Sequence, residues 1–470
     1  MKNKIVKNLS YSVLANGTNT LVAMILVLFV PKILGVEEYS YWQLYLFYAS
    51  YVGFFHFGWA DGVYLRFGGK KYDELDKGYF HSQFWLLAIM EMIIAVAIIL
   101  LALFIVPDQK KVSVFFAVGI CCFLQIPRTF LQYILQATDK IVNYAKNFLW
   151  EKILYAIFVV LFLSIGIRNF EFLIMADLIA RAVTLVLLIR ECKDIVLKRF
   201  SGVSNVIRDA WLNISVGSKL MFANIASNLL LGIVRWAVQN HWSVETFGKV
   251  SLSITASNLL MTFINAVSIV LYPMLKNKSQ SQYASVYSKM RNMLMILVLG
   301  LLIVYYPIQH ILSWWLPQYA ESLKYMALLF PMCVFESKMA LLVNTYLKAL
   351  RQEKRIMYIN WISVVITLIS TIVFVYVLDS LIFSVLSLTI LMGIRCGMGE
   401  IILARMIKLD MRKDIISEWL LIIVFICTGW FLDSIWITII YAIAYGVYLL
   451  WKKESLQAIA ENYKIIKKRI

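Results

Sequence analysis

The stretch Ile93–Val106, with the sequence IIAVAIILLALFIV, decides the class of fold. It is apolar throughout and does not alternate between apolar and polar residues, so it does not read as a strand of a transmembrane barrel. A helix needs about 20 mainly apolar residues to cross the hydrocarbon core of a bilayer. With its mainly apolar neighbours, the stretch extends over 80–106 and is long enough. We therefore predict a membrane-spanning helix here.

Segments of the same kind recur along the whole chain. They carry few charges and are predicted at 9–30, 41–65, 80–106, 112–137, 143–166, 171–190, 213–239, 250–275, 291–313, 323–347, 356–378, 381–404, 415–432 and 434–451. The sequence therefore predicts an all-α polytopic membrane protein with about 14 transmembrane helices.

The overall composition agrees with this class. The chain has 470 residues, of which 61% are hydrophobic and 15% are charged, and its mean hydropathy is +0.78. Soluble domains are about half apolar and about a quarter charged. The apolar segment after Met1–Lys4 is too long for a signal peptide, so we expect the first helix to be retained. The six cysteines have no zinc-binding or disulfide spacing, so no metal site is expected.

The net charge of +18 is distributed very unevenly. Most of the 45 lysines and arginines fall at the N-terminus, in alternate loops and in the C-terminal tail, all on one side of the predicted membrane. The basic residues predicted on the other side are Lys32, Lys110, Lys111, Arg168, Lys249 and Lys324. This is the positive-inside pattern, so both termini are predicted to be cytoplasmic. The charge then favours anionic membrane lipids, and we expect no binding to nucleic acid.

Two short patterns in the first half of the chain return in the second half. Val36–Leu44 and Val244–Leu252 share the pattern Val-Glu-x-aromatic-small-x-x-x-Leu. Tyr133–Ala137 and Tyr346–Ala349 resemble each other at similar places between helices. A repeat of six helices predicts two parallel lobes, and transporters with such repeats commonly bind substrate near the membrane midplane.

The repeat divides the chain into three predicted parts. Residues 1–200 form an N-terminal six-helix lobe and residues 201–410 a C-terminal six-helix lobe. Residues 411–470 add two C-terminal helices and a basic cytoplasmic tail.

Several motifs resemble those of the Wzx-type polysaccharide and O-antigen flippases, which belong to the multidrug/oligosaccharidyl-lipid/polysaccharide (MOP) exporter superfamily. They are Lys7-Asn8 at the first helix, the turn Pro31–Ser40, Tyr272-Pro273 near the end of the eighth helix, and the passage Tyr346–Gln352. The chain departs from the family pattern at Arg235, where many relatives carry an acidic residue, and at Ser40 and Arg351 or Gln352, which replace glycines.

The resemblance implies a specific transport function. Such a protein moves an undecaprenyl-diphosphate-linked oligosaccharide from the cytoplasmic to the outer leaflet of the bacterial plasma (inner) membrane by alternating access. Its partners would be this substrate, membrane lipids and the polysaccharide polymerase machinery. No cofactor is expected, and the coupling ion would be Na⁺ or H⁺.

Charged residues inside the predicted spans are the candidate site, because a central Arg or Lys costs about 3 kcal/mol on insertion scales. The candidate substrate-binding cations are Arg128, Arg181, Arg235, Lys338 and Arg395. Arginine binds phosphate oxygens bidentately and keeps its charge, which suits a lipid diphosphate. The candidate ion-coupling residues are Glu91, Asp177 and Glu336. No catalytic residue is predicted.

Structural interpretations stand beside these functional ones. Asp177 and Arg181 are four residues apart on one helix face and could neutralise each other. Asp61 lies near a membrane face, where a structural role is an alternative. His56 could relay protons or could be a packed, hydrogen-bonded histidine.

Two other functions compete with the flippase. A multidrug and toxic-compound extrusion (MATE) antiporter would share the fold, but cationic drugs call for acidic rather than cationic sites. A membrane enzyme such as a polysaccharide polymerase or ligase would be expected to have a long external loop, whereas the external loops predicted here are short. The sequence therefore favours a flippase that is not an enzyme.

Overall fold

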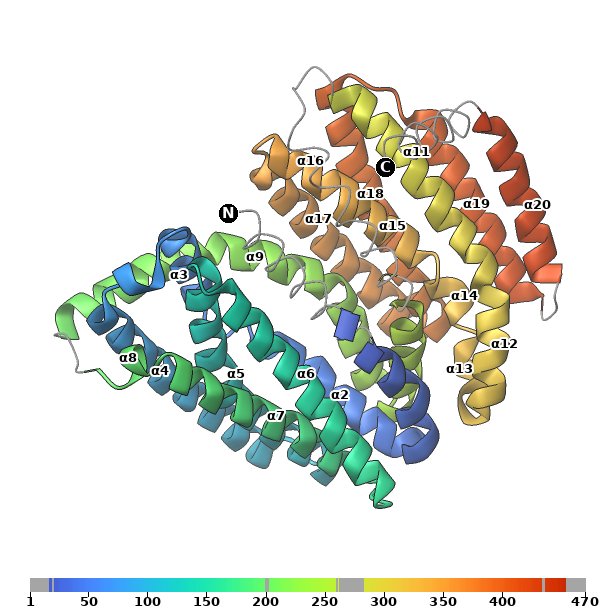
Figure 1. Ribbon diagram of the computed structural model, residues 1–470. Helices are drawn as coiled ribbons and strands as arrows, with labels where there is room; N and C mark the ends of the chain where they lie inside the picture. The colour runs from blue at the N-terminus through green and yellow to red at the C-terminus, as the bar shows by residue number, and fades with distance from the viewer. Residues whose placement is uncertain are drawn as a thin grey trace, which may run out of the picture. The chain divides into compact units, whose positions relative to one another are not determined.

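The computed structural model describes residues 17–18, 21–198, 203–258, 261, 283–432 and 436–453 (Figure 1). Every regular element among these residues is a helix. Contacts within the chain divide it into two compact units, Met1–Ile225 (unit 1) and Ala226–Ile470 (unit 2). The division falls inside one long helix, α9 (Val203–His241).

Unit 1 begins with the apolar helix Leu21–Leu34. It continues with α2 (Val36–Val52), α3 (Trp59–Phe67), the short 3-10 helix η1 (Tyr72–Glu74), α4 (Lys77–Ile105), α5 (Gln109–Ala137), α6 (Ile141–Ser164), α7 (Phe170–Glu191), α8 (Lys193–Val196) and the first part of α9. Helix α5 packs against α2, α3, α4, α6 and α7, so it lies at the centre of this unit.

Local sequence signals fix where α4 and α5 begin. The Asp76 side chain accepts hydrogen bonds from the backbone N–H groups of Gly78 and Tyr79 at the start of α4. Asp108 does the same for Lys110 and Lys111 at the start of α5. Each aspartate is therefore an N-cap that satisfies otherwise unpaired donors of the first helical turn.

The prediction of one helix over 41–65 is wrong in one respect, because the structure has two helices there. Helix α2 ends at Val52, a turn follows, and α3 starts at Trp59. Phe57 and Gly58 in this turn have φ values of 52° and 87°, which end a right-handed helix. The residues of the turn are mostly apolar or aromatic, so hydropathy alone gives no sign of the break.

Unit 2 contains the rest of α9, a helical segment at 244–258, α11 (Tyr283–Leu301), η3 (Leu302–Val304), α12 (Tyr305–Trp315), η4 (Pro317–Tyr319), α13 (Ala320–Leu323), α14 (Met326–Leu329), α15 (Met332–Lys338), the π-helix η5 (Met339–Val343), α16 (Asn344–Ala349), α17 (Glu353–Thr371), the π-helix η6 (Ile372–Val377), α18 (Leu381–Ile407), α19 (Arg412–Phe431) and α20 (Trp436–Trp451). Helix α15 packs against α11 and α18, and α14 packs against α18 and α19. The run Met326–Ala349, predicted as one span at 323–347, is thus a segmented helix in the core of unit 2.

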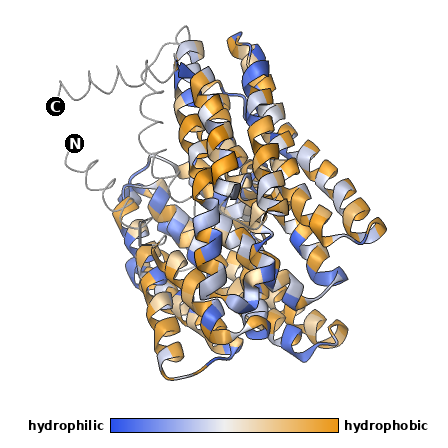
Figure 2. Cartoon of the chain, turned by 90° about the vertical axis from the view of Figure 1, so that its right-hand side faces the viewer, coloured by the Kyte–Doolittle hydropathy of each residue, from blue (hydrophilic) through white to orange (hydrophobic). Residues whose placement is uncertain are grey.

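Ten helices in the described part of the chain are long and apolar enough to cross a membrane. Shorter apolar helices lie at Leu21–Leu34 and Thr438–Trp451. Apolar residues cover most of the length of the helices (Figure 2), and large ones such as Phe104, Ile105 and Leu101 are exposed. An all-helical polytopic membrane protein is therefore confirmed. Each of the 14 predicted spans overlaps a described helix, although 9–30, 250–275 and 434–451 lie partly outside the described residues.

Candidate functional site

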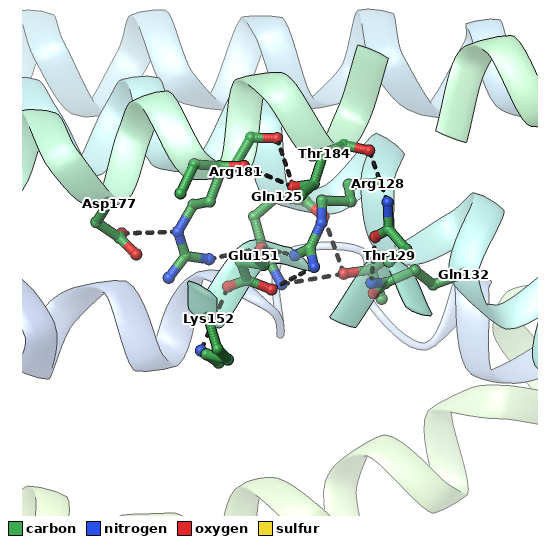
Figure 3. A network of polar contacts seen from close by, with 11 residues as sticks. Gln125, Arg128, Thr129, Gln132, Glu151, Lys152, Asp177, Arg181 and Thr184 are labelled. Atoms are coloured by element: carbon green, nitrogen blue, oxygen red, sulfur yellow. Dashed lines mark hydrogen bonds and ion pairs between the residues drawn. The ribbon is translucent and has the colours of Figure 1, made fainter. Parts of the chain in front are cut away.

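A polar network in unit 1 joins four helices around two of the predicted cations (Figure 3). The Nε of Arg181 on α7 lies 2.7 Å from Oδ2 of Asp177, one turn away on the same helix. The Tyr45 hydroxyl of α2 donates to the same carboxylate oxygen at 2.6 Å. The pairing that helical spacing suggested for Asp177 and Arg181 is therefore present.

The amide of Gln125 connects Arg181 to Arg128, which lies on α5 one turn further along. Its Oε1 accepts from Arg181 Nη1 at 2.5 Å and from Arg128 Nη1 at 3.1 Å. Its Nε2 donates to Thr129 Oγ1 at 3.2 Å, which fits an amide with its oxygen turned toward the two guanidinium groups. One neutral amide oxygen is thus shared by two arginines.

Arg128 forms an ion pair with Glu151 of α6 through Nη2 and Oε2. The other oxygen of Glu151 lies 3.4 Å from Nζ of Lys152. The sequence analysis did not single out Glu151, although it lies within the predicted span 143–166. A count of every charge inside that span would have found it.

The five charged side chains of this cluster, Arg128, Glu151, Lys152, Asp177 and Arg181, comprise three cations and two anions. They differ in exposure: the Arg128 side chain is 2% exposed, that of Arg181 13% and that of Lys152 25%. Arg128 is therefore enclosed and already neutralised. Arg181 and Lys152 are the cations of this cluster that keep some exposed surface.

A second network lies in unit 2 around Lys338 on α15. Its Nζ lies 2.6 Å from Glu400 Oε2 of α18 and 2.7 Å from Glu418 Oε2 of α19. Arg291 of α11 pairs with Glu400 and lies 2.8 Å from Glu418 Oε1 through its Nη2. The predicted candidate Lys338 thus belongs to a buried, alternating set of cations and anions, which includes Arg291 and Glu418, two residues that sequence reasoning did not single out.

Arg395 of α18 lies apart from that network. Its Nη1 lies 3.2 Å from Glu336 Oε2, its Nε donates to Asn360 Oδ1 at 2.9 Å, and its Nη2 donates to Ser227 Oγ at 2.9 Å. Glu336 is half-buried, with 34% of its side chain exposed. The structure therefore pairs a predicted substrate-binding cation with a predicted ion-coupling acid.

The remaining candidates lie in separate places. Arg235 Nη2 donates to Ser251 Oγ at 2.9 Å, and the guanidinium lies over the Phe247 ring at 5.1 Å. Glu91 of α4 is fully buried, and its Oε2 accepts from Cys122 Sγ at 3.1 Å. No group of three His, Cys, Asp or Glu side chains able to hold a metal ion occurs among the described residues.

Comparison with known proteins gives a fold but no close relative. No protein-family model matches the chain, and no curated protein matches it. Among solved structures, the lipid II flippase MurJ in an inward closed conformation matches with a TM-score of 0.63 and 13% identity, over 96% of this chain and 100% of that chain. An inward-facing MATE family transporter of the MOP superfamily matches with a TM-score of 0.57 and 11% identity, over 83% of this chain and 97% of that chain.

The chain has the fold of the MOP superfamily transporters. A MATE structure in complex with MaL6 also matches, with a TM-score of 0.53 and 11% identity over 86% of this chain and 96% of that one. The MurJ and MATE structures that match are those of transporters. At these identities the likeness concerns the fold, so the substrate must be argued from the residues of this chain.

Proposed function

We propose that this chain is a Wzx-type flippase that moves an undecaprenyl-diphosphate-linked oligosaccharide from the cytoplasmic to the outer leaflet by alternating access. It would act in a bacterial plasma (inner) membrane with both termini in the cytoplasm. Fourteen transmembrane helices, arranged as two six-helix lobes with two C-terminal helices, are part of the proposal. The carried glycan would enter cell-surface polysaccharide synthesis such as O-antigen assembly, next to the polymerase machinery.

The observation that carries the proposal is the cationic excess of the unit 1 cluster inside membrane-spanning helices. A diphosphate must leave headgroup water on its way across the bilayer, and charge-assisted hydrogen bonds from cations offset that loss. Arg181 and Lys152 are the partly exposed cations of the cluster. We assign them the first contact with the diphosphate, and Arg128 the role of holding Glu151 in place. Arg235, Lys338 and Arg395 remain candidate cations of the substrate path.

A MATE-type antiporter of cationic drugs or metabolites is the second candidate, favoured by the likeness to MATE structures. It would need an acidic group open to the substrate, and two of the three predicted acids, Asp177 and Glu336, already have cationic partners. Asp177 is moreover buried under Tyr45 and Arg181. We therefore favour the flippase. Glu91, Asp177 and Glu336 stay candidates for coupling to Na⁺ or H⁺.

The test is where lipid-linked oligosaccharide accumulates in cells that lack this protein. We expect build-up in the cytoplasmic leaflet that is relieved by the wild type but not by Arg181→Gln or Lys152→Gln. Lys354→Gln is a matched control, because Lys354 is exposed and its loss changes the net charge equally. The amount of each variant in the membrane and its thermal unfolding show whether it folds. Unchanged glycolipid together with altered sensitivity to cationic drugs would overturn the proposal in favour of the antiporter.

A further inference from the structure

A histidine and an aspartate lie together at the break between α2 and α3. His56 is in the turn that follows α2, and Asp61 is in the first turn of α3. They are 3% and 5% exposed, and Nε2 of His56 lies 3.8 Å from Oδ2 of Asp61. Breaks in transmembrane helices are the places where transporters commonly build ion and substrate sites.

The backbone of the break fixes the tautomer of His56. The N–H of Gly58 donates to His56 Nδ1 at 2.9 Å, so Nδ1 accepts and carries no proton. In the neutral ring the proton is then on Nε2, the nitrogen that faces Asp61. A second proton on the ring would occupy Nδ1 and remove the hydrogen bond from Gly58. The charge of His56 and the local backbone of the break are therefore linked.

The pair is isolated from other cations. Among the described residues, no lysine or arginine lies within 4.0 Å of the Asp61 carboxylate, and His56 is its sole ion-pair partner. Arg66, on the same helix, is directed to Asn213 Oδ1 at 2.6 Å and to the Tyr79 hydroxyl at 3.3 Å.

The other helices packed against α3 present uncharged or weakly acidic groups. Trp59, at the start of α3, donates to Gln83 of α4, and the backbone of Ser218 on α9 lies against Gly58. Tyr133 of α5 lies near Asp61 and packs on the Tyr64 ring of α3. Tyr79 of α4 and Asn213 of α9 contact Arg66. Asp209 on α9 lies toward Tyr79. A bare Asp61 carboxylate would therefore have no permanent counter-charge in its surroundings.

An isolated carboxylate buried without a counter-ion is strongly disfavoured, so the pair must hold a proton while it stays buried. That proton can sit on the carboxyl, or on the imidazole as the second proton of an ion pair. Its release leaves a bare carboxylate, which is tolerated only when water reaches the break. Binding and release are thus tied to how open the break is.

We propose that His56 and Asp61 form a proton-binding site at the break between α2 and α3. The ligand is a proton, taken up when the break is closed and released when it is hydrated. That this site couples protons to transport rests on the proposed flippase function. That it binds a proton does not depend on that function, because this claim follows from the burial and geometry of the pair alone.

The alternative site for a coupling proton is Glu91. It is also buried, and its Oε2 contacts Cys122. Asp177 and Glu336 differ from Glu91 and Asp61, because each forms an ion pair with an arginine. Glu91→Gln is therefore the matched control, since it removes one buried carboxyl group from unit 1 just as Asp61→Asn does.

The first experiment follows the carbonyl band of protonated carboxyl groups by infrared difference spectroscopy on the purified full chain in lipid, from acidic to alkaline pH. Asp61 and Glu91 are each expected to contribute a component to this band. We expect a titrating component that is lost in Asp61→Asn and kept in Glu91→Gln, where the component of Glu91 is lost instead. In His56→Gln we expect the midpoint of the Asp61 component to shift, because the partner imidazole is gone. A band unchanged in a folded Asp61→Asn variant, the same component lost in both variants, or an unmoved midpoint in His56→Gln would each overturn the proton site.

The second experiment separates coupling from transport itself. In proteoliposomes, a fluorescent undecaprenyl-diphosphate oligosaccharide is followed with and without an imposed proton gradient. We expect Asp61→Asn to abolish the stimulation by the gradient while exchange without a gradient persists. Stimulation that survives in Asp61→Asn would overturn the coupling role. A wild-type protein that moves no glycolipid at all would overturn the proposed function, while the infrared titration would still decide the proton site.

Discussion

The Nζ of Lys338 lies 2.7 Å from Oε2 of Glu418, and this contact joins α15 to α19 in the core of unit 2. The same glutamate is reached by Arg291 of α11 through its other oxygen. Asp414, one turn earlier on α19, lies 2.6 Å from Nζ of Lys452, which follows α20. A buried ion pair therefore ties α19 to α15, and a partly buried one ties the residue after α20 to α19.

Removal of Glu418 should strongly destabilise unit 2. The substitution Glu418→Ala leaves Lys338 and Arg291 with one shared carboxylate, Glu400, in a buried site. Breaking one partner of a buried ion pair costs about 3–5 kcal/mol, because the remaining charge is uncompensated. Thermal unfolding in detergent measures the loss. The control Glu245→Ala removes an exposed carboxylate and should change stability by less than about 0.5 kcal/mol. Equal effects of the two variants would contradict the network.

Arg128 and Glu151 should behave as a coupled structural pair. Arg128→Gln strands the Glu151 carboxylate, with Lys152 as its remaining neighbour, and Glu151→Gln strands the guanidinium. Each single variant should lower the free energy of unfolding by about 3–5 kcal/mol. The double variant should lose clearly less than the two together, with a coupling of about 0.5–3 kcal/mol. Thermal unfolding of the wild type, the two single variants and the double variant measures this coupling energy. Additive losses would show that Arg128 does not depend on Glu151 and would return it to the set of free substrate-binding cations.

The sequence predicts the class of fold well, because the need to cover a bilayer core imposes one apolar length on every span. Ile93–Ile105 forms the last part of α4, which is long enough to cross, and Val106 is the residue that caps it. The break after α2 could not be predicted in the same way. It depends on the close approach of Gly58 and Gly62 to the backbone of α9, a contact between distant parts of the chain.

In the candidate site too, contacts within one helix could be predicted from the sequence, whereas contacts between helices could not. The pairing of Asp177 with Arg181 follows from helical spacing and could be predicted from the sequence. The partner of Arg128 could not be predicted, since Glu151 lies on a different helix and sequence distance gives no sign of the contact. Lys338 also finds its carboxylates on α18 and α19, through tertiary packing alone.

The contact between α8 and the start of α4 should respond to acid. The Tyr72 hydroxyl donates to Asp194 Oδ1 at 2.8 Å, and Lys77 Nζ lies 3.2 Å from Oδ2. Burial opposes the charged carboxylate, but these hydrogen bonds from Tyr72 and Lys77 outweigh it and lower the pKa of Asp194. Because the folded-state pKa lies below the unfolded value of about 3.9, the stabilisation is present above that pH and is lost as the pH falls further.

The measurement for Asp194 is the difference in thermal midpoint between the wild type and Asp194→Asn. We expect the wild type to be more stable from neutral pH down to about pH 4, and the difference in thermal midpoint to shrink as the pH falls further. Asp73→Asn serves as the control, because Asp73 follows Tyr72 in η1 and is exposed. A difference that persists in strong acid would mean that the charge of Asp194 does not hold this contact.

Gly62 should tolerate no side chain, because α3 and α9 touch there through their backbones. A Cβ at Gly62 would lie 1.9 Å from the carbonyl oxygen of Asn213, and one at Gly217 would lie 2.0 Å from that of Gly58. A backbone atom cannot turn aside as a flexible side chain can, so Gly62→Ala must push the two helices apart. Overpacking of this kind costs about 1–3 kcal/mol, and the displacement also disturbs the neighbouring hydrogen bond from Arg66 to Asn213.

The matched control is Gly397, another glycine inside a helix, in α18. A Cβ there would meet nothing within 4 Å. Gly397→Ala should therefore leave the thermal midpoint unchanged or raise it, since alanine favours helix over glycine by up to about 1 kcal/mol. If Gly62→Ala is as stable as Gly397→Ala, α3 does not rest on the backbone of α9. The break that brings His56 and Asp61 together would then need another cause than the backbone contact of Gly58 and Gly62 with α9.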